Sequence, residues 1–218
     1  DDINGLEILR YTSSHPMDVS DELIEVHGVS KKLSRHLHLP VQSGSNSVLE
    51  RMLRGYTAER YLQIVEKLKK HRSDIVLTTD IICGFPNETE DEHRDTLKLL
   101  DAVQFASIYA YAYSPRPGTK AYKMEDNLDD ETRNRRLREV QAHQLNIQEI
   151  NRQHLVGKVY RVLVDGHSEK NGILRWKGRT NCMHIVHFLP QEEGKDYLWH
   201  WVDVEIVSAT RLSCQGKV

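Results

Sequence analysis

Residues 75–92, IVLTTDIICGFPNETEDE, contain a strand, a loop and the start of a helix in direct succession. The β-branched run Ile75–Cys83 predicts a strand. Gly84 breaks this run, and Thr89 with Glu92 has the pattern of a capping box, which begins a helix. A strand followed by a helix is the unit from which parallel sheets with crossover helices are built.

The same alternation recurs on both sides of this stretch. Helix-period segments follow Asp18 or Ser20, and again follow Thr57. Because a closed eight-unit barrel takes about 250 residues, the four units predict a small open sheet or a partial (βα) barrel of parallel strands. The predicted strands are Glu7–Thr12, Arg35–Val41, Ile75–Cys83 and Ala106–Tyr113.

A long charged helix, Asp129–Leu155, is predicted to connect this part to a tail of different character. Its charge run Arg133–Arg138 is expected to be a solvated face. In the tail, an alternating run at Lys158–Val164 is followed by an expected turn at Asp165-Gly166. Several further short strands predict a small β-barrel of the oligonucleotide-binding kind. These runs are Ile173–Trp176, Met183–Phe188, Tyr197–Ser208 and Arg211–Gly216.

The composition supports two domains, residues 1–154 and residues 155–218. The formal net charge is −2, and all three tryptophans lie in the second segment, which is mildly basic. A basic, aromatic module suggests nucleic acid as a partner. The run Arg175, Trp176, Lys177 and Arg179 combines phosphate pairing with base stacking, although an ordinary hairpin with exposed cations is the alternative.

No apolar stretch approaches about 18 residues, and no leader is visible, so neither a membrane partner nor secretion is expected. The three cysteines, Cys83, Cys182 and Cys214, are far apart and form neither a disulfide framework nor a metal-ligand spacing. We therefore expect a reducing, cytoplasmic location. The chain begins at Asp1 without Met, which suggests a fragment.

Polar and glycine-containing loops follow all four predicted strands, and ligands of parallel α/β folds bind beyond the carboxyl ends of the strands. Gln42 and Ser43 offer neutral hydrogen-bonding groups suited to a ribose or an amide. Gly84 would let the backbone approach a flat ring, and Arg116 could clamp a carboxylate or phosphate. Turn formation and loop bracing are the alternatives for these residues. No Walker-type or G-x-G-x-x-G phosphate loop occurs.

His36 and His38 form an H-x-H pair that could bind a metal in a metallohydrolase. The strand ends at Cys83 and Tyr113 provide no further His or Asp, so core or second-layer histidines are favoured. Cys83 is interpreted as a small buried residue rather than a nucleophile, because no base follows it in its loop.

Three long motifs resemble the radical S-adenosylmethionine (SAM) methylthiotransferases, and the resemblance extends over the whole chain. These are HLHLPVQSGSNSVLERMLRGYT, TTDIICGFPNETEDE and YAYSPRPGTKAYKM, with KVYRVLVDGHS in the tail. The resemblance is to the branch that adds a methylthio group to isopentenyl-adenosine beside the tRNA anticodon. Related enzymes acting on threonylcarbamoyl-adenosine, and a non-catalytic RNA-binding relative, are alternatives.

The resemblance implies the last four units of a radical SAM barrel followed by an RNA-binding TRAM domain. It implies SAM and two four-iron four-sulfur clusters as cofactors, with tRNA and a flavodoxin-type electron donor as partners. The cluster cysteines of the family have no match here, so the chain alone is expected to be inactive. By motif, the implied SAM-binding residues are Ser14, Gln42, Ser43, Gly84 and Phe85, and the implied substrate-side residues are Tyr113 and Arg116.

The family usually has Gly at the position of Asn87. Asn is the residue best able to replace Gly at a positive φ, so we expect the loop to keep its shape.

Overall fold

A three-stranded parallel sheet organises the first part of the structure, a computed structural model that describes residues 1–11, 15–190 and 194–218. The strands are β1 (His36–His38), β2 (Val76–Cys83) and β3 (Ser107–Ala112), in the order β1-β2-β3. The prediction of a parallel α/β arrangement is confirmed, but the sheet has three strands rather than four. The predicted strand Glu7–Thr12 contributes one isolated bridge, between Leu9 and Leu33.

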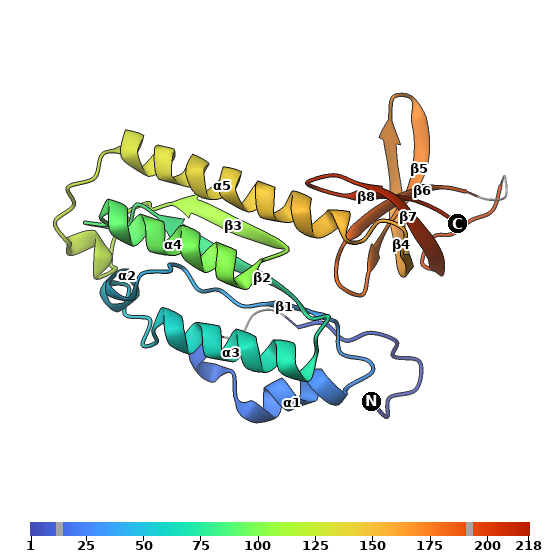
Figure 1. The fold of residues 1–218 in the computed structure, drawn as a ribbon, viewed down its shortest axis with the longest axis horizontal. Coiled ribbons are helices and arrows are strands. Elements are labelled where there is room, and N and C mark those ends of the chain that lie inside the picture. The colour runs from blue at the N-terminus through green and yellow to red at the C-terminus, as the bar shows by residue number, and fades with distance from the viewer. Residues whose placement is uncertain (12–14, 191–193) are drawn as a thin grey trace.

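Helices cover one face of this sheet (Figure 1). Their caps follow from local sequence, since Ser20, Thr57, Thr89 and Asp129 each accept a hydrogen bond from a backbone N–H in the first turn. The capping box of Thr89 and Glu92 is present as predicted. The helices are α1 (Asp21–Val29), α2 (Asn46–Arg51), α3 (Ala58–His71), α4 (Glu90–Val103) and α5 (Asp130–Gln153), with short 3₁₀ turns η1 (Pro16–Asp18) and η2 (Ala121–Lys123).

The core of this part lies between the sheet and its helices. Leu37, Ile81 and Phe105 are fully buried in it, together with Tyr61 of α3 and Leu100 of α4. The other face of the sheet carries no helix, and Tyr109 and Tyr111 of β3 are about half exposed there. Loops after β1, β2 and β3 leave the sheet at one end, which is the left end in Figure 1.

The tail forms a closed five-stranded barrel, in the order β4-β5-β6-β8-β7. Its strands are β4 (Val159–Lys170), β5 (Ile173–Thr180), β6 (Ile185–Leu189), β7 (Trp201–Ala209) and β8 (Cys214–Lys217). The barrel encloses its own core, which includes Val162, Phe188 and Val204. The predicted turn at Asp165-Gly166 is wrong, because β4 continues through it with a bulge between Val164 and Gly166.

The barrel contacts the opposite end of the sheet from the three loops. Ser34 Oγ donates to the Asn181 carbonyl at 2.8 Å, and Arg35 N donates to Asn181 Oδ1 at 3.1 Å. At the end of α5, Gln153 Nε2 donates to the Ala209 carbonyl. Among the described residues, no helix is long and apolar enough to cross a membrane.

Candidate functional site

The loops at the carboxyl ends of the strands surround one hollow, which we call the carboxyl-end hollow. Its volume is about 470 Å³, within the range of small-molecule sites. Gln42 comes from the loop after β1, Phe85 from the loop after β2 and Thr119 from the loop after β3. The full lining is Gln42, Arg51, Met52, Leu53, Arg54, Ile82, Phe85, Thr119, Lys120 and Ala121.

The loop after the first predicted strand, Glu7–Thr12, ends beside the loop that follows the second predicted strand, Arg35–Val41. Ser14 lies outside the described residues, but the ring of His15 packs edge-on against Tyr56 with 5.4 Å between centroids. The Tyr56 hydroxyl donates to the Val41 carbonyl at 2.9 Å. The end of the first loop therefore lies next to the segment that carries Gln42.

Gln42 and Ser43 are adjacent, but the structure gives them different surroundings. Gln42 has a positive φ of 74° and lines the hollow. Ser43 is fully buried, and its hydroxyl lies 3.3 Å from Thr96 Oγ1 of α4. The Ser43 hydroxyl also accepts a hydrogen bond from Ser45 N. Ser43 thus packs the loop against α4, away from the hollow.

Phe85 and Tyr113 form an aromatic pair at the edge of the hollow, with centroids 5.2 Å apart. The Tyr113 hydroxyl is buried and has no hydrogen-bond partner among the described residues. Desolvation and the nearby Asp126 carboxylate raise the pKa of Tyr113. An unpaired buried hydroxyl is unfavourable, but Tyr113 is not among the residues that line the hollow.

Gly84 has a φ of 69°, and its missing Cβ makes room for the Arg133 side chain rather than for a ligand. Arg116, by contrast, is exposed on the loop after β3. Its carbonyl accepts hydrogen bonds from the backbone N–H and the hydroxyl of Thr119, which shape this loop.

The two strand histidines share the Thr78 hydroxyl as a hydrogen-bonding partner. Thr78 Oγ1 lies 2.9 Å from His36 Nε2 and 3.0 Å from His38 Nδ1. Burial lowers the pKa of His36 to about 4, so this imidazole is neutral at pH 7. No group of three His, Cys, Asp or Glu side chains within the described ranges could hold a metal. His38 Nε2 also lies 3.4 Å from the Asp80 carboxylate, so both histidines have polar partners within the sheet.

Cys83 is buried, as interpreted from the sequence, and burial raises the pKa of its thiol to about 12. Cys214 is buried in the barrel core, whereas Cys182 lies at the junction between barrel and sheet. The three thiols do not form a common site.

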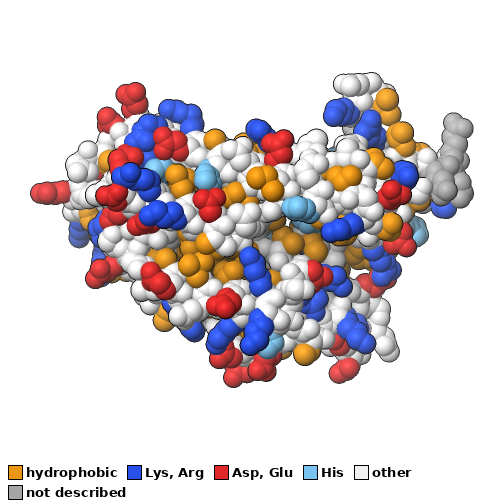
Figure 2. All heavy atoms as spheres, in the orientation of Figure 1, with side chains coloured by type: hydrophobic (Ala, Val, Ile, Leu, Met, Phe, Trp, Pro, Cys, Tyr) orange, Lys and Arg blue, Asp and Glu red, His pale blue; other side chains and the backbone are white. Residues whose placement is uncertain are grey.

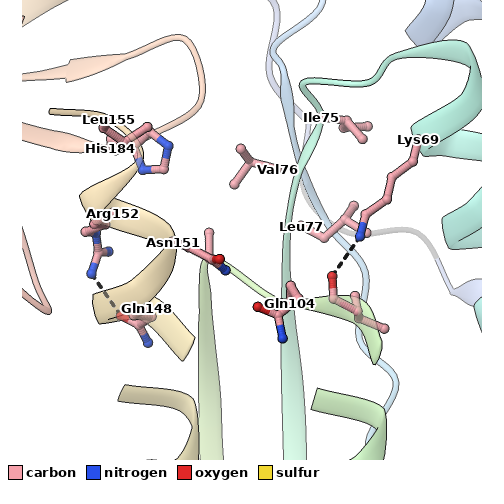
Figure 3. A pocket seen from close by; sticks show the side chains of 12 residues that line it. Lys69, Ile75, Val76, Leu77, Gln104, Gln148, Asn151, Arg152, Leu155 and His184 are labelled. Carbon is pink, nitrogen blue, oxygen red and sulfur yellow. Dashed lines mark hydrogen bonds between the residues drawn. The ribbon is translucent and has the colours of Figure 1, made fainter. Parts of the chain in front are cut away.

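A second hollow, of about 270 Å³, lies at the other end of the sheet (Figure 3). Lys69 Nζ donates to the Val103 carbonyl there, and Arg152 Nη1 donates to Gln148. Burial lowers the pKa of His184, which enters from the barrel, to about 4. The Lys69 contact satisfies the C-terminal end of α4, and Arg152 is held by a neighbouring side chain of α5, so we do not take this hollow as the site.

The basic run of the barrel is mostly held by partners. Trp176 stacks on His167 and packs against the barrel core. Arg175 donates to Gln215. Lys177 and Arg179 share the carboxylate of Asp165.

Exposed groups that the sequence did not single out lie elsewhere on the barrel. The Arg161 guanidinium lies 4.9 Å from the ring centroid of Trp201, and Trp199 is 68% exposed. Arg10, from the first part of the chain, lies near Arg179. Burial, and to a smaller extent this like charge, lowers the pKa of Arg10.

The sequence analysis also missed the burial of Arg133 and Arg136. Their run was expected to be solvated, but these residues are only 7% and 2% exposed. Both lie on the helical stripe of Val140 and Ile147, a spacing that could have revealed them. Figure 2 shows basic and acidic side chains intermingled over α4 and α5, where Arg135 pairs with Glu90 and Glu139.

Comparison with known proteins gives two kinds of match. Residues 5–100 match the Radical SAM superfamily. The whole chain is similar to proteins named tRNA-2-methylthio-N(6)-dimethylallyladenosine synthase. It is 42% identical to one from Caldicellulosiruptor saccharolyticus, over 99% of this chain and 45% of that protein. It is 41% identical to one from an Acidovorax species, over 100% of this chain and 48% of that protein. It is 40% identical to one from Yersinia pseudotuberculosis, over 98% of this chain and 44% of that protein. The chain thus spans about half the length of these relatives.

Proposed function

The chain belongs to the radical SAM superfamily, in its methylthiotransferase branch, and from this premise we propose that it holds SAM and tRNA for a tRNA-2-methylthio-N(6)-dimethylallyladenosine synthase. One observation carries the proposal. The loops after three parallel strands converge on one hollow, as a cofactor site of this fold requires.

The residues of the carboxyl-end hollow fit an adenosyl group. Ile82 and Phe85 offer apolar contact to a purine ring, and the Gln42 amide suits a ribose hydroxyl. Tyr113 would support the Phe85 ring through their edge-on contact. Ser43 and Gly84 would shape the loops rather than touch the ligand. SAM would supply the reactive adenosyl group and the methyl group, and this chain's residues would bind it, orient it and exclude water.

The described residues do not fit an iron–sulfur cluster. Such clusters need several cysteine thiolates together, whereas Cys83 and Cys214 are buried in separate cores. The two clusters implied by the resemblance would take their ligands from outside this chain. We place the reaction in the cytoplasm, with a flavodoxin-type electron donor.

For the domains, we propose a partial radical SAM barrel over 1–154 and a TRAM-like RNA-binding barrel over 155–218. The charge around Asp165 supports RNA binding, because Lys177 and Arg179 share its one carboxylate and Arg10 adds a further cation near Arg179. An excess of cations over anions attracts phosphates. Arg175 and Arg116 would add phosphate contacts, whereas the packed Trp176 would support the surface from below.

Analysis of modified nucleosides tests the proposed reaction. In cells without this gene, we expect tRNA to lose 2-methylthio-N(6)-dimethylallyladenosine and to accumulate the same nucleoside without the methylthio group. Loss of a methylthio group from threonylcarbamoyl-adenosine would favour the alternative substrate. Unchanged tRNA would contradict the proposal.

Removal of the barrel tests the tRNA contact. Deleting residues 155–218 from the protein at its natural length is expected to weaken tRNA binding and to flatten its salt dependence, because phosphate contacts release counterions. Unchanged affinity and salt slope would remove the role proposed for the barrel.

A further inference from the structure

Two of the four arginines between residues 133 and 138 are buried. Arg133 and Arg136 lie on the buried side of α5, whereas Arg135 is about 40% exposed and Arg138 is exposed. Burying a guanidinium is costly unless a carboxylate and further hydrogen bonds satisfy it. The partners of Arg133 and Arg136 therefore show what this part of α5 holds.

Arg136 pairs with the half-exposed Glu90 of α4 and with the buried Glu88, which lies at the end of the loop that follows β2. Arg136 Nη1 donates to Glu88 Oε2 at 2.9 Å and to the Glu88 carbonyl at 2.8 Å. The two side chains are only 3% and 1% exposed. Glu88 Oε2 also accepts a hydrogen bond from Gly84 N at 2.8 Å. One buried carboxylate thus joins α5 to both ends of the loop.

Arg133 holds the same loop at its other end. Its Nε donates to the Gly84 carbonyl at 3.2 Å, and it pairs with Asp126 and Asp130. A Cβ on Gly84 would lie 2.5 Å from Arg133 Cγ. Gly84 is therefore needed both for its φ of 69° and for the close approach of Arg133.

The loop between these anchors carries Phe85, which lines the carboxyl-end hollow. We propose that Arg136 and Arg133 are positioning residues, which act through Glu88 and Gly84 to hold Phe85 where the hollow receives the adenosyl group. The effect of these two arginines on ligand binding rests on the proposed function, whereas their effect on the order of the loop does not.

The charges around Glu88 explain why Arg136 matters. Glu88 faces Arg136 from α5, His93 from α4, the Gly84 N–H and the Cys83 thiol. Burial raises the pKa of Glu88, and the Gly84 N–H and Arg136 act against this effect. Without Arg136, a buried carboxylate would lose its counterion, and the loop would have to rearrange or Glu88 would take up a proton.

The test compares Arg136→Met with Arg135→Met. Met keeps an apolar stem in both, and Arg135 is the adjacent residue, which pairs with Glu90 and Glu139 outside the loop. Two quantities are measured. The first is the amide exchange rate of Gly84, relative to α4 amides, in the 218-residue chain. The second is the affinity of the natural-length protein for S-adenosylhomocysteine.

We expect Arg136→Met to speed Gly84 exchange and to weaken S-adenosylhomocysteine binding by about tenfold or more, as loss of a charge-assisted hydrogen bond implies. Arg135→Met should change both by less than about threefold, as expected for an exposed pair. Unchanged Gly84 exchange in Arg136→Met would overturn the proposal.

The double variant Arg136→Met with Glu88→Gln separates positioning from stability. It removes the uncompensated charge, so the melting temperature should recover while the affinity stays low. Full recovery of affinity would show a purely stabilising pair and overturn the proposed role. If the unaltered protein does not bind S-adenosylhomocysteine, the proposed function fails, and Gly84 exchange still decides whether α5 orders the loop.

Discussion

Asn87 adopts the left-handed conformation, with a φ of 60°, in the loop that α5 holds. Its Nδ2 donates to the Glu125 carbonyl at 2.8 Å. Asparagine tolerates this conformation better than other non-glycine residues, because its short polar side chain bonds locally. The positive φ considered from the sequence is therefore present at this residue.

Asn87→Ala should lower the free energy of unfolding by about 1–2 kcal/mol, since alanine carries the left-handed penalty without the hydrogen bond to the Glu125 carbonyl. Asn87→Gly should change it by less, because glycine relieves the backbone. Urea denaturation of both variants measures the difference. Equal stability of the two variants would contradict this reading of the loop.

Within single elements, local signals succeeded where the determinants are local. Ser20, Thr57 and Thr89 were recognisable as helix caps, because their partners lie within three residues. The segment Glu7–Thr12 was predicted as a strand from its residue types alone. In the structure Leu9 is 49% exposed and pairs with the chain on one side only. The segment therefore buries too little apolar surface to stabilise a longer strand.

β5 approaches β4 closely at Gly178. A Cβ at this position would lie 2.3 Å from the Leu163 carbonyl oxygen, which is backbone and cannot move aside easily. Gly178→Ala should therefore cost about 1–3 kcal/mol of stability. Gly172→Asn is the control, because it adds a side chain to open space at a φ that asparagine tolerates. Thermal unfolding distinguishes them, and similar melting temperatures would refute the predicted clash.

Across the whole molecule, the sheet–barrel junction contains two histidines whose pKa values are about 4. Burial is the largest cause for both His36 and His184. The charges of His38 and Arg10 add to it at His36, and those of Arg152 and His36 add to it at His184. In the unfolded chain each of these two imidazoles takes up a proton near pH 6.5, whereas in the folded chain it does so only near pH 4. Stability should therefore be full above about pH 6.5 and fall as the pH drops toward 4.

The urea midpoint measured between pH 7 and pH 4 tests this coupling. His36→Gln and His184→Gln should each flatten the decline, while the exposed His154→Gln should leave it unchanged. A midpoint that declines equally in all three variants would show that other groups carry the effect.

The whole arrangement was partly predictable from the sequence. Strand and helix periods gave the parallel sheet and the separate five-stranded barrel. The motifs placed Gln42 and Phe85 at one end of the sheet. However, the pair of Glu88 and Arg136 joins residues far apart in the chain, and only tertiary packing decides that this arginine is buried while Arg135 is not. For the same reason the sequence could not show that Ser43 packs against α4.

Hydrogen exchange of the natural-length protein with and without S-adenosylhomocysteine tests the central claim most directly. We predict that the ligand protects the loops around Gln42, Phe85 and Thr119, which line the carboxyl-end hollow. Protection confined to the other end of the sheet, around Lys69 and His184, would contradict the account.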